Sequence, residues 1–144
     1  YGGVADVWSV TSWGELRRDG LAHDKAKFND PFGEHAPTWV ESKLAGTQGP
    51  IVAVSDYMHA VPDLIRPWVP REYTTLGADG FGFSDTRAAA RRYYNIDGPS
   101  IAVAVLQQLA YKGEIPREWP VEAAERYRLD DVSAGTSGKT GDDE

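Results

Sequence analysis

A glycine-rich segment between a strand-like run and a helix-like run constrains the fold of this chain more than any other feature. Residues 77–82 contain three glycines, which is too many for a helix, and they follow a strand-like run at 72–76. A helix-like run at 85–94 comes directly afterwards. Strand, glycine turn and helix in this order are typical of α/β domains, where such a loop lies at the carboxyl edge of a sheet. Ser84 or Asp85 is expected to cap the helix by accepting a hydrogen bond from its first N–H groups.

The glycine loop does not by itself specify a ligand. The spacing of Gly77, Gly80 and Gly82 is not a dinucleotide-binding fingerprint, and the chain has no Gly-Lys-Ser/Thr phosphate loop. A structural turn is therefore the favoured interpretation of this segment when it is considered alone.

The remaining pattern alternates strands with helices. This order predicts an α/β domain, a three-layer α/β/α sandwich with a mostly parallel sheet. The continuous apolar run at 51–55 predicts a strand covered on both faces. Ser12 and Glu15 predict a capping box for the first helix, with Leu16 facing inward. The strands are expected at Val4–Ser12, 51–55 and Tyr73–Leu76, and the helices at 13–28, 38–44, around Pro62 up to Trp68, 85–94, 99–112 and Val121–Tyr127. In the helix after Pro99, the expected inward face is Ile101, Val105 and Leu109, with Ala102 and Leu106 beside it.

Composition limits the kinds of protein to which this chain can belong. The chain has 144 residues, 41% of them hydrophobic, which is enough to build one domain with a core. Its net charge of −7 disfavours nucleic acid and anionic membranes as partners, and no apolar run approaches the length of a membrane helix. The absence of cysteine excludes disulfides and thiol catalysis, and it fits a cytoplasmic location. The chain starts with Tyr rather than Met, so we expect it to be a piece of a longer protein.

The last residues differ in composition from the rest. Residues 131–144 hold four acidic residues, one Lys and little apolar area. We therefore expect one domain at 1–130 followed by a disordered, dispensable acidic tail at 131–144.

Several segments, in this order, resemble the C-terminal domain of the homodimeric pyruvate dehydrogenase decarboxylating component, a thiamine-diphosphate enzyme of the transketolase-like superfamily. The Asp79-Gly80-Phe81-Gly82 segment followed by Ser84-Asp85 favours this family over transketolases, which carry an Asp-Arg-Phe-Gly-type loop followed by Ser-Ala-Pro. Many family members have a basic residue where this chain has Phe83. The resemblance covers roughly residues 1 to 130 and is carried by 7–16, 55–58, 65–70, 73–82, 84–87 and 106–115.

The resemblance implies a function for the parent enzyme. That enzyme would decarboxylate pyruvate on thiamine diphosphate with magnesium and pass the acetyl group to lipoyl-lysine of an acyltransferase core. The family binds the cofactor through a Gly-Asp-Gly segment ending in Asn in its first domain, and its activating Glu lies in its middle domain. This chain therefore holds no catalytic, cofactor-binding or metal-binding residue, and the isolated fragment is expected to be inactive. The family domain also opens with one further strand and helix, whose absence here would leave a sheet edge or a sheet face uncovered.

The expected role of this domain is structural, in the homodimer of the parent enzyme. The interface candidates are Asp79, Phe81, Phe83, Arg87 and Arg91. The two arginines are four residues apart and share a helix face, which predicts a solvated or interfacial surface, with an anion site as the less favoured alternative.

Other polar residues are expected to have local structural roles. Asp56 is expected to cap the helix that follows it, and His23, His35 and His59 have surface or capping roles because they lack metal-ligand spacing. The alternatives for the function are another 2-oxo-acid dehydrogenase, a transketolase, or a stand-alone protein-interaction module.

Overall fold

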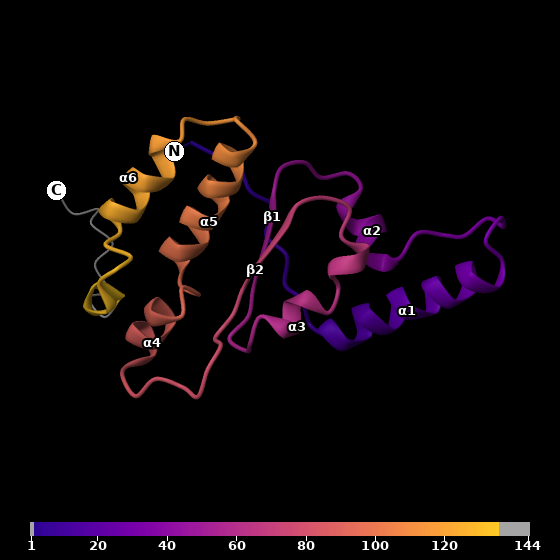
Figure 1. The fold of residues 1–144 in the computed structure, drawn as a ribbon, viewed down its shortest axis with the longest axis horizontal. Coiled ribbons are helices and arrows are strands. Elements are labelled where there is room, and N and C mark those ends of the chain that lie inside the picture. Colours follow the sequence, from indigo (N-terminus) through magenta and orange to yellow (C-terminus); the bar gives the residue numbers. More distant parts are fainter. Residues whose placement is uncertain (1, 136–144) are drawn as a thin grey trace.

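A computed structural model of the chain describes residues 2–135 and shows a small parallel sheet with helices on both sides (Figure 1). Strand β1 (Ile51–Val54) pairs in parallel with β2 (Tyr73–Leu76), with Ile51 opposite Tyr73 and Val54 opposite Leu76. On one side lie α4 (Arg87–Tyr93), α5 (Gly98–Tyr111) and α6 (Glu118–Arg126), and on the other α1 (Trp13–Asn29), α2 (Trp39–Leu44) and α3 (Ala60–Asp63). Two 3₁₀ turns, η1 (Arg66–Trp68) and η2 (Val132–Gly135), complete the elements found within residues 2–135. The predicted α/β class with a parallel sheet is confirmed.

The strand predicted at residues 4–12 is absent. Among residues 2–135, only β1 and β2 form a sheet, and the segment before α1 has no strand hydrogen-bonded to it. Val4 is 101% and Val7 92% exposed, and only Val10, at 37%, is partly covered. A strand needs a neighbour to satisfy its backbone N–H and C=O groups, and neither β1 nor β2 is that neighbour here.

The first core cluster joins α1 and α2 to the segment between the strands. Its buried members are Val40, Ile65 and Trp68. The Trp68 indole lies directly against Gly20 of α1, where an added Cβ would be 2.3 Å from the ring. This contact explains why α1 tolerates a glycine in its interior, because any larger residue would displace the tryptophan. The Trp68 Nε1–H also donates to Asp24 Oδ1 at 3.0 Å.

The second core cluster joins α5 to α6. Val103, Leu106 and Ala123 are buried there, with partly buried neighbours that include Tyr127 and Leu129. The predicted inward face of α5 is therefore rotated. Its buried residues are Ser100, Val103, Ala104, Leu106 and Ala110, whereas Ile101, Val105 and Leu109 are only half-buried. The reason is that α5 packs on two elements at once, β1 and α6, so its apolar residues divide between two contacts.

Three helix starts differ from the predictions in detail. Ser12 caps α1 as predicted, but Glu15 pairs with Arg18 at 2.8 Å and the structure assigns no reciprocal bond to it. Thr86, not Ser84 or Asp85, caps α4 by accepting from the Ala89 N–H at 3.2 Å. The helix predicted around Pro62 is split into α3 and η1, because Pro67 has no N–H to donate to the carbonyl of Asp63, four residues earlier, and its ring clashes with that carbonyl in an α-helix.

The predicted tail boundary at residue 131 also differs from the structure. Residues 132–135 form η2, which packs on α4. Gly135 is close enough to α4 that an added Cβ would be 2.8 Å from Arg92 Cβ. The remaining residues of the predicted tail, 136–144, lie outside the described part of the chain. Within residues 2–135, no helix is both long enough and apolar enough to cross a membrane.

Candidate functional site

The loops that follow β1 and β2 meet at one edge of the sheet, because the two strands run parallel and end side by side. Three hydrogen bonds join these loops. The Ala78 N–H donates to the Tyr57 carbonyl at 2.8 Å, and the His59 N–H donates to Asp79 Oδ1 at 2.9 Å. The His59 Nδ1 lies 2.5 Å from Asp79 Oδ2. The two loops therefore form one connected surface.

The close approach of the two loops requires a glycine at position 77. Gly77 is buried, and an added Cβ would lie 2.5 Å from the His59 amide nitrogen and 2.8 Å from the Tyr57 carbonyl oxygen. Both contacts are with backbone, which cannot move aside cheaply. Gly77 is thus a packing position and not a ligand-binding one.

The other two glycines present an aromatic side chain to solvent. Gly80 and Gly82 have φ angles of +114° and +105°, which other residues rarely adopt. Between them, Phe81 is 113% exposed. Phe83 instead stacks on Tyr93 of α4, with ring centroids 4.4 Å apart and planes 4° from parallel. Of the two predicted interface aromatics, Phe81 is the one whose ring is fully available to a partner.

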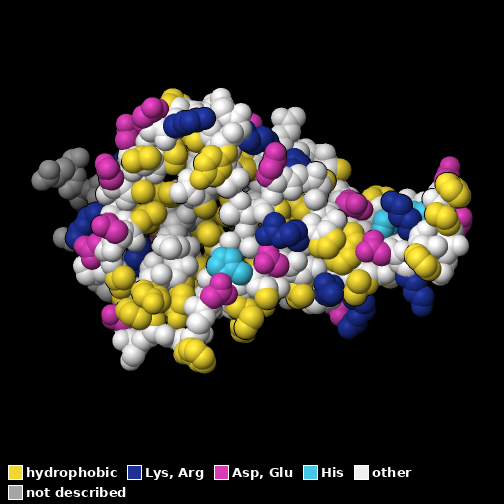
Figure 2. Space-filling model, in the orientation of Figure 1, with side chains coloured by type: hydrophobic (Ala, Val, Ile, Leu, Met, Phe, Trp, Pro, Cys, Tyr) yellow, Lys and Arg dark blue, Asp and Glu magenta, His cyan; other side chains and the backbone are white. Residues whose placement is uncertain are grey.

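The two predicted arginines share one carboxylate. Arg91 lies 3.2 Å and Arg87 4.0 Å from Asp56 Oδ2, so both point toward the loop after β1. The predicted capping role of Asp56 is therefore wrong, and α3 has no side-chain cap. The side chain of Arg87 remains 79% exposed. Figure 2 shows hydrophobic side chains reaching the surface along the lower edge of the view, over these loops and α4.

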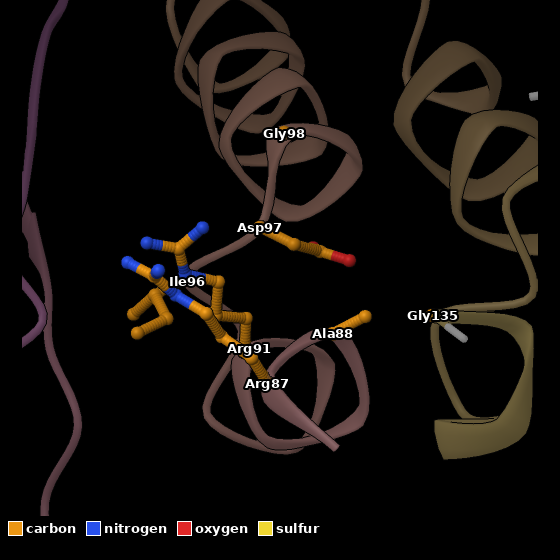
Figure 3. Close-up of a pocket in the computed structure, with 7 residues that line it drawn as sticks. All are labelled: Arg87, Ala88, Arg91, Ile96, Asp97, Gly98 and Gly135. Carbon is orange, nitrogen blue, oxygen red and sulfur yellow. The ribbon is translucent and has the colours of Figure 1, made fainter. Parts of the chain in front are cut away.

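A cavity of about 420 Å³ lies at the junction of α4 and α5. In Figure 3 the guanidinium groups of Arg87 and Arg91 extend beside Ile96, whereas Asp97 points the other way. The arginines thus do not converge with the rest of the lining into one anion-binding cradle. The full lining is Arg87, Ala88, Arg91, Ile96, Asp97, Gly98 and Gly135.

A third arginine, Arg92, has a different role from its neighbours. Its side chain is only 4% exposed, and its Nε donates to Asp97 Oδ2 at 2.6 Å. Its Nη1 donates to the carbonyls of Tyr127 at 2.7 Å and Arg128 at 3.0 Å. These two carbonyls directly follow α6, so Arg92 satisfies hydrogen-bond acceptors at the C-terminal end of that helix. Burial acts to raise the pKa of Asp97, but hydrogen bonds from Ser100 and Arg92 outweigh it, so this pKa lies below its ordinary value.

Sequence reasoning singled out Arg87 and Arg91 on this helix and missed the role of Arg92. The available signal was the Asp97-Gly-Pro start of α5, since Asp97 is the N-cap whose Oδ1 accepts from the Ser100 N–H at 3.0 Å. A capping aspartate five residues after an arginine is a candidate partner for that arginine.

The described residues do not form a metal centre. Within residues 2–135, no group of three or more His, Cys, Asp or Glu side chains is arranged to hold an ion. The three histidines make different contacts. His59 pairs with Asp79, and His35 contacts the Asp30 carbonyl at 2.6 Å through Nε2. His23 lies edge-on to His35, with ring centroids 6.3 Å apart.

The fold and this edge define a transketolase-like C-terminal domain. The family model for the transketolase-like TK C-terminal domain matches residues 1–97, and the chain belongs to this family. It is similar to the pyruvate dehydrogenase E1 component of Mycolicibacterium smegmatis, with 60% identity over 131 residues that cover 91% of this chain and 14% of that protein. For the same component of Mycobacterium tuberculosis the identity is 57% over 137 residues, covering 95% and 15%. For that of Escherichia coli K12 it is 34% over 131 residues, covering 90% and 14%. The chain therefore spans about 14–15% of the length of these relatives.

Proposed function

We propose that this chain is the C-terminal domain of a cytoplasmic pyruvate dehydrogenase E1 and serves as a structural and dimerisation domain of that enzyme. The parent enzyme decarboxylates pyruvate on thiamine diphosphate and acetylates lipoyl-lysine of an acyltransferase core. The identity of 60% and 57% to proteins named as this component supports the proposal.

The residues of this chain do not fit the cofactor of that reaction. The sequence has no Gly-Asp-Gly segment ending in Asn, and the acidic side chains at the candidate edge already have partners. Asp56 pairs with the two arginines and Asp79 with His59. We therefore propose that thiamine diphosphate and magnesium bind elsewhere in the parent enzyme and that this domain contributes contacts rather than chemistry.

The observation that carries the dimerisation role is the exposed ring of Phe81 on a loop that is held in place. Full burial of such a side chain is worth about 1.5–3 kcal/mol, which is a strong drive toward a partner surface. Interfaces combine an aromatic anchor with a polar rim in which arginine is enriched. Arg87, 79% exposed beside Phe81's loop, supplies such a rim group. A second subunit or a neighbouring domain of the parent enzyme is the proposed partner of this edge.

Phe81→Ser in the full-length enzyme is expected to weaken dimerisation at least about tenfold, because about 1.5 kcal/mol or more of burial is lost. Sedimentation across a concentration series measures the dissociation constant, and circular dichroism reports the fold. The matched control is Tyr111→Ser, since Tyr111 is another exposed aromatic, 78% exposed, at the end of α5. An unchanged dissociation constant for Phe81→Ser, or loss of the fold itself, would contradict the proposal.

The 144-residue chain is expected to bind no thiamine diphosphate, with or without magnesium, because residues 2–135 hold no ion cluster and the sequence lacks the diphosphate segment. Isothermal titration of the chain measures this, with the full-length enzyme as the positive control. Micromolar binding by the isolated chain, about −8 kcal/mol, would show that the domain itself holds the cofactor.

A further inference from the structure

The distal half of α1 and the loop that returns from it project away from the sheet as an arm (Figure 1). We define the arm as residues 24–37. All of its residues are exposed except Gly33 and His35, which are half-buried. The arm therefore contributes little to either core cluster of its own domain.

The arm nevertheless has a defined shape. The Gly33 N–H donates to the Asp30 carbonyl at 3.3 Å, and His35 Nε2 contacts the same carbonyl at 2.6 Å. Gly33 packs so closely on Asp30 that an added Cβ would overlap its carboxylate. At its base, Asp24 accepts from the Trp68 indole N–H. Such local bonding lowers the entropy cost of docking, since the arm is already ordered before it meets a partner.

The tip of the arm is apolar with a charged rim. Phe28 is 86% and Phe32 100% exposed. Figure 2 shows hydrophobic side chains at the right-hand end of the molecule with side chains of both charge signs around them. The exposed charges are of mixed sign and nearly balanced: Asp24, Lys25, Lys27, Asp30 and Glu34. The arm thus fits an apolar groove and does not select a strongly charged partner.

The apolar area that this tip can bury distinguishes between possible partners. Two phenylalanine rings bury about 300–500 Å² together, at 150–250 Å² each. A stable complex of separate molecules needs about 800 Å² on each partner. The two rings alone are therefore too small to hold a second free molecule, but they suffice within one polypeptide, where the effective concentration of the partner surface is in the millimolar range. Relatives of which this chain spans 14–15% have ample further chain to supply such a groove.

We propose that the arm docks, through Phe28 and Phe32, into an apolar groove on another part of the same longer polypeptide, outside residues 1–144. This contact is separate from the Phe81 loop, which lies at the opposite side of the sheet from the arm tip (Figure 1). It ties this domain to the remainder of its own chain, whereas the loop contacts a subunit or domain at the strand ends.

Photo-crosslinking in the full-length enzyme tests the docking. A benzophenone amino acid at position 28 is expected to give a product of single-chain mass, cross-linked to a peptide outside residues 1–144. The control position is 111, at the exposed Tyr111, where a lower yield is expected. A product of doubled mass would assign the arm to a second copy and overturn the proposal. A cross-link within residues 1–144, or a yield no higher than at position 111, would also overturn it.

Limited proteolysis gives a second readout, because Lys25 and Lys27 place two trypsin sites in the arm. Phe28→Ser combined with Phe32→Ser is expected to accelerate cleavage there at least about tenfold in the full-length enzyme, since cleavage follows the population of the open state. Tyr111→Ser is expected to leave the rate unchanged. Equal cleavage rates in the wild type and the double variant would show that the arm is already undocked.

Discussion

Arg92→Ala is expected to lower the free energy of unfolding of this chain by about 3–5 kcal/mol, the usual cost of removing one member of a buried ion pair. The guanidinium of Arg92 holds three groups at once: the Asp97 carboxylate and the carbonyls of Tyr127 and Arg128. Without it, Asp97 is left in a site where its side chain is only 14% exposed, and the C-terminal end of α6 loses two hydrogen bonds. Domains are stable by about 5–15 kcal/mol, so this loss approaches global unfolding.

Urea denaturation of the chain measures the effect, with Arg128→Ala as the matched control. Arg128 also pairs with an aspartate, Asp131, but its side chain is 63% exposed, so its removal is expected to cost at most about 1 kcal/mol. If the two variants lost equal stability, the buried role assigned to Arg92 would be wrong.

The same pair gives a second readout in acid. The pKa of Asp97 is lowered in the folded state, so its contribution to stability is complete above the unfolded value of about 3.9 and is lost as the pH falls through the lower folded value. The wild-type chain should therefore lose part of its stability below about pH 4. Arg92→Ala should show less of this loss, because the groups that lower the pKa of Asp97 include Arg92.

Trp68→Ala is expected to lower the free energy of unfolding by about 3–5 kcal/mol, since Trp68 is the bulkiest of the three buried side chains of the first core cluster. Trp68 is 5% exposed and packs with Val40 and Ile65. Its ring also fills the space above Gly20 and bonds to Asp24. The variant should therefore loosen α1 from the body of the domain as well as leave a cavity.

Thermal and urea denaturation measure this loss, with Trp39→Ala as the control. Trp39 is 57% exposed and lies under Lys43 Nζ, 4.3 Å from its ring centroid, so its removal is expected to cost about 1 kcal/mol or less. Gly20→Ala provides a sharper test, because its Cβ would overlap the Trp68 ring only when that ring is present. It should destabilise the wild type by about 1–3 kcal/mol and cost much less in the Trp68→Ala background. Equal costs in both backgrounds would contradict the packing described.

Elements whose causes are local could be predicted from the sequence. The first helix follows from Ser12 and the break at 29–31, and α5 follows from Pro99 and Gly113. The strands β1 and β2 follow from short apolar or β-branched runs bounded by turn residues. The prediction of a strand at 4–12 was wrong because a strand also needs a cause that is not local. Its alternation is a local signal, but pairing depends on a neighbour that this chain does not place beside it.

The candidate site was predictable only as far as its residues lie on one stretch of chain. The loop, its position after a strand and the shared face of Arg87 and Arg91 could be read from spacing. Contacts across 35 residues or more, such as Arg91 with Asp56 and Arg92 with Tyr127, could not, because they depend on packing of distant elements. For the same reason, sequence reasoning could not tell that Phe83 stacks on Tyr93 and that Phe81 faces solvent.

The central claim is that the loop after β2 is a contact surface of a larger enzyme, and a structure of the full-length protein in its solution assembly tests it most directly. The measurement is the exposure of the Phe81 ring, which is 113% exposed in this chain alone. We expect the ring to be buried against a second subunit or another domain, with Arg87 at the rim of that contact. A full-length structure in which Phe81 still projects into solvent would contradict the account.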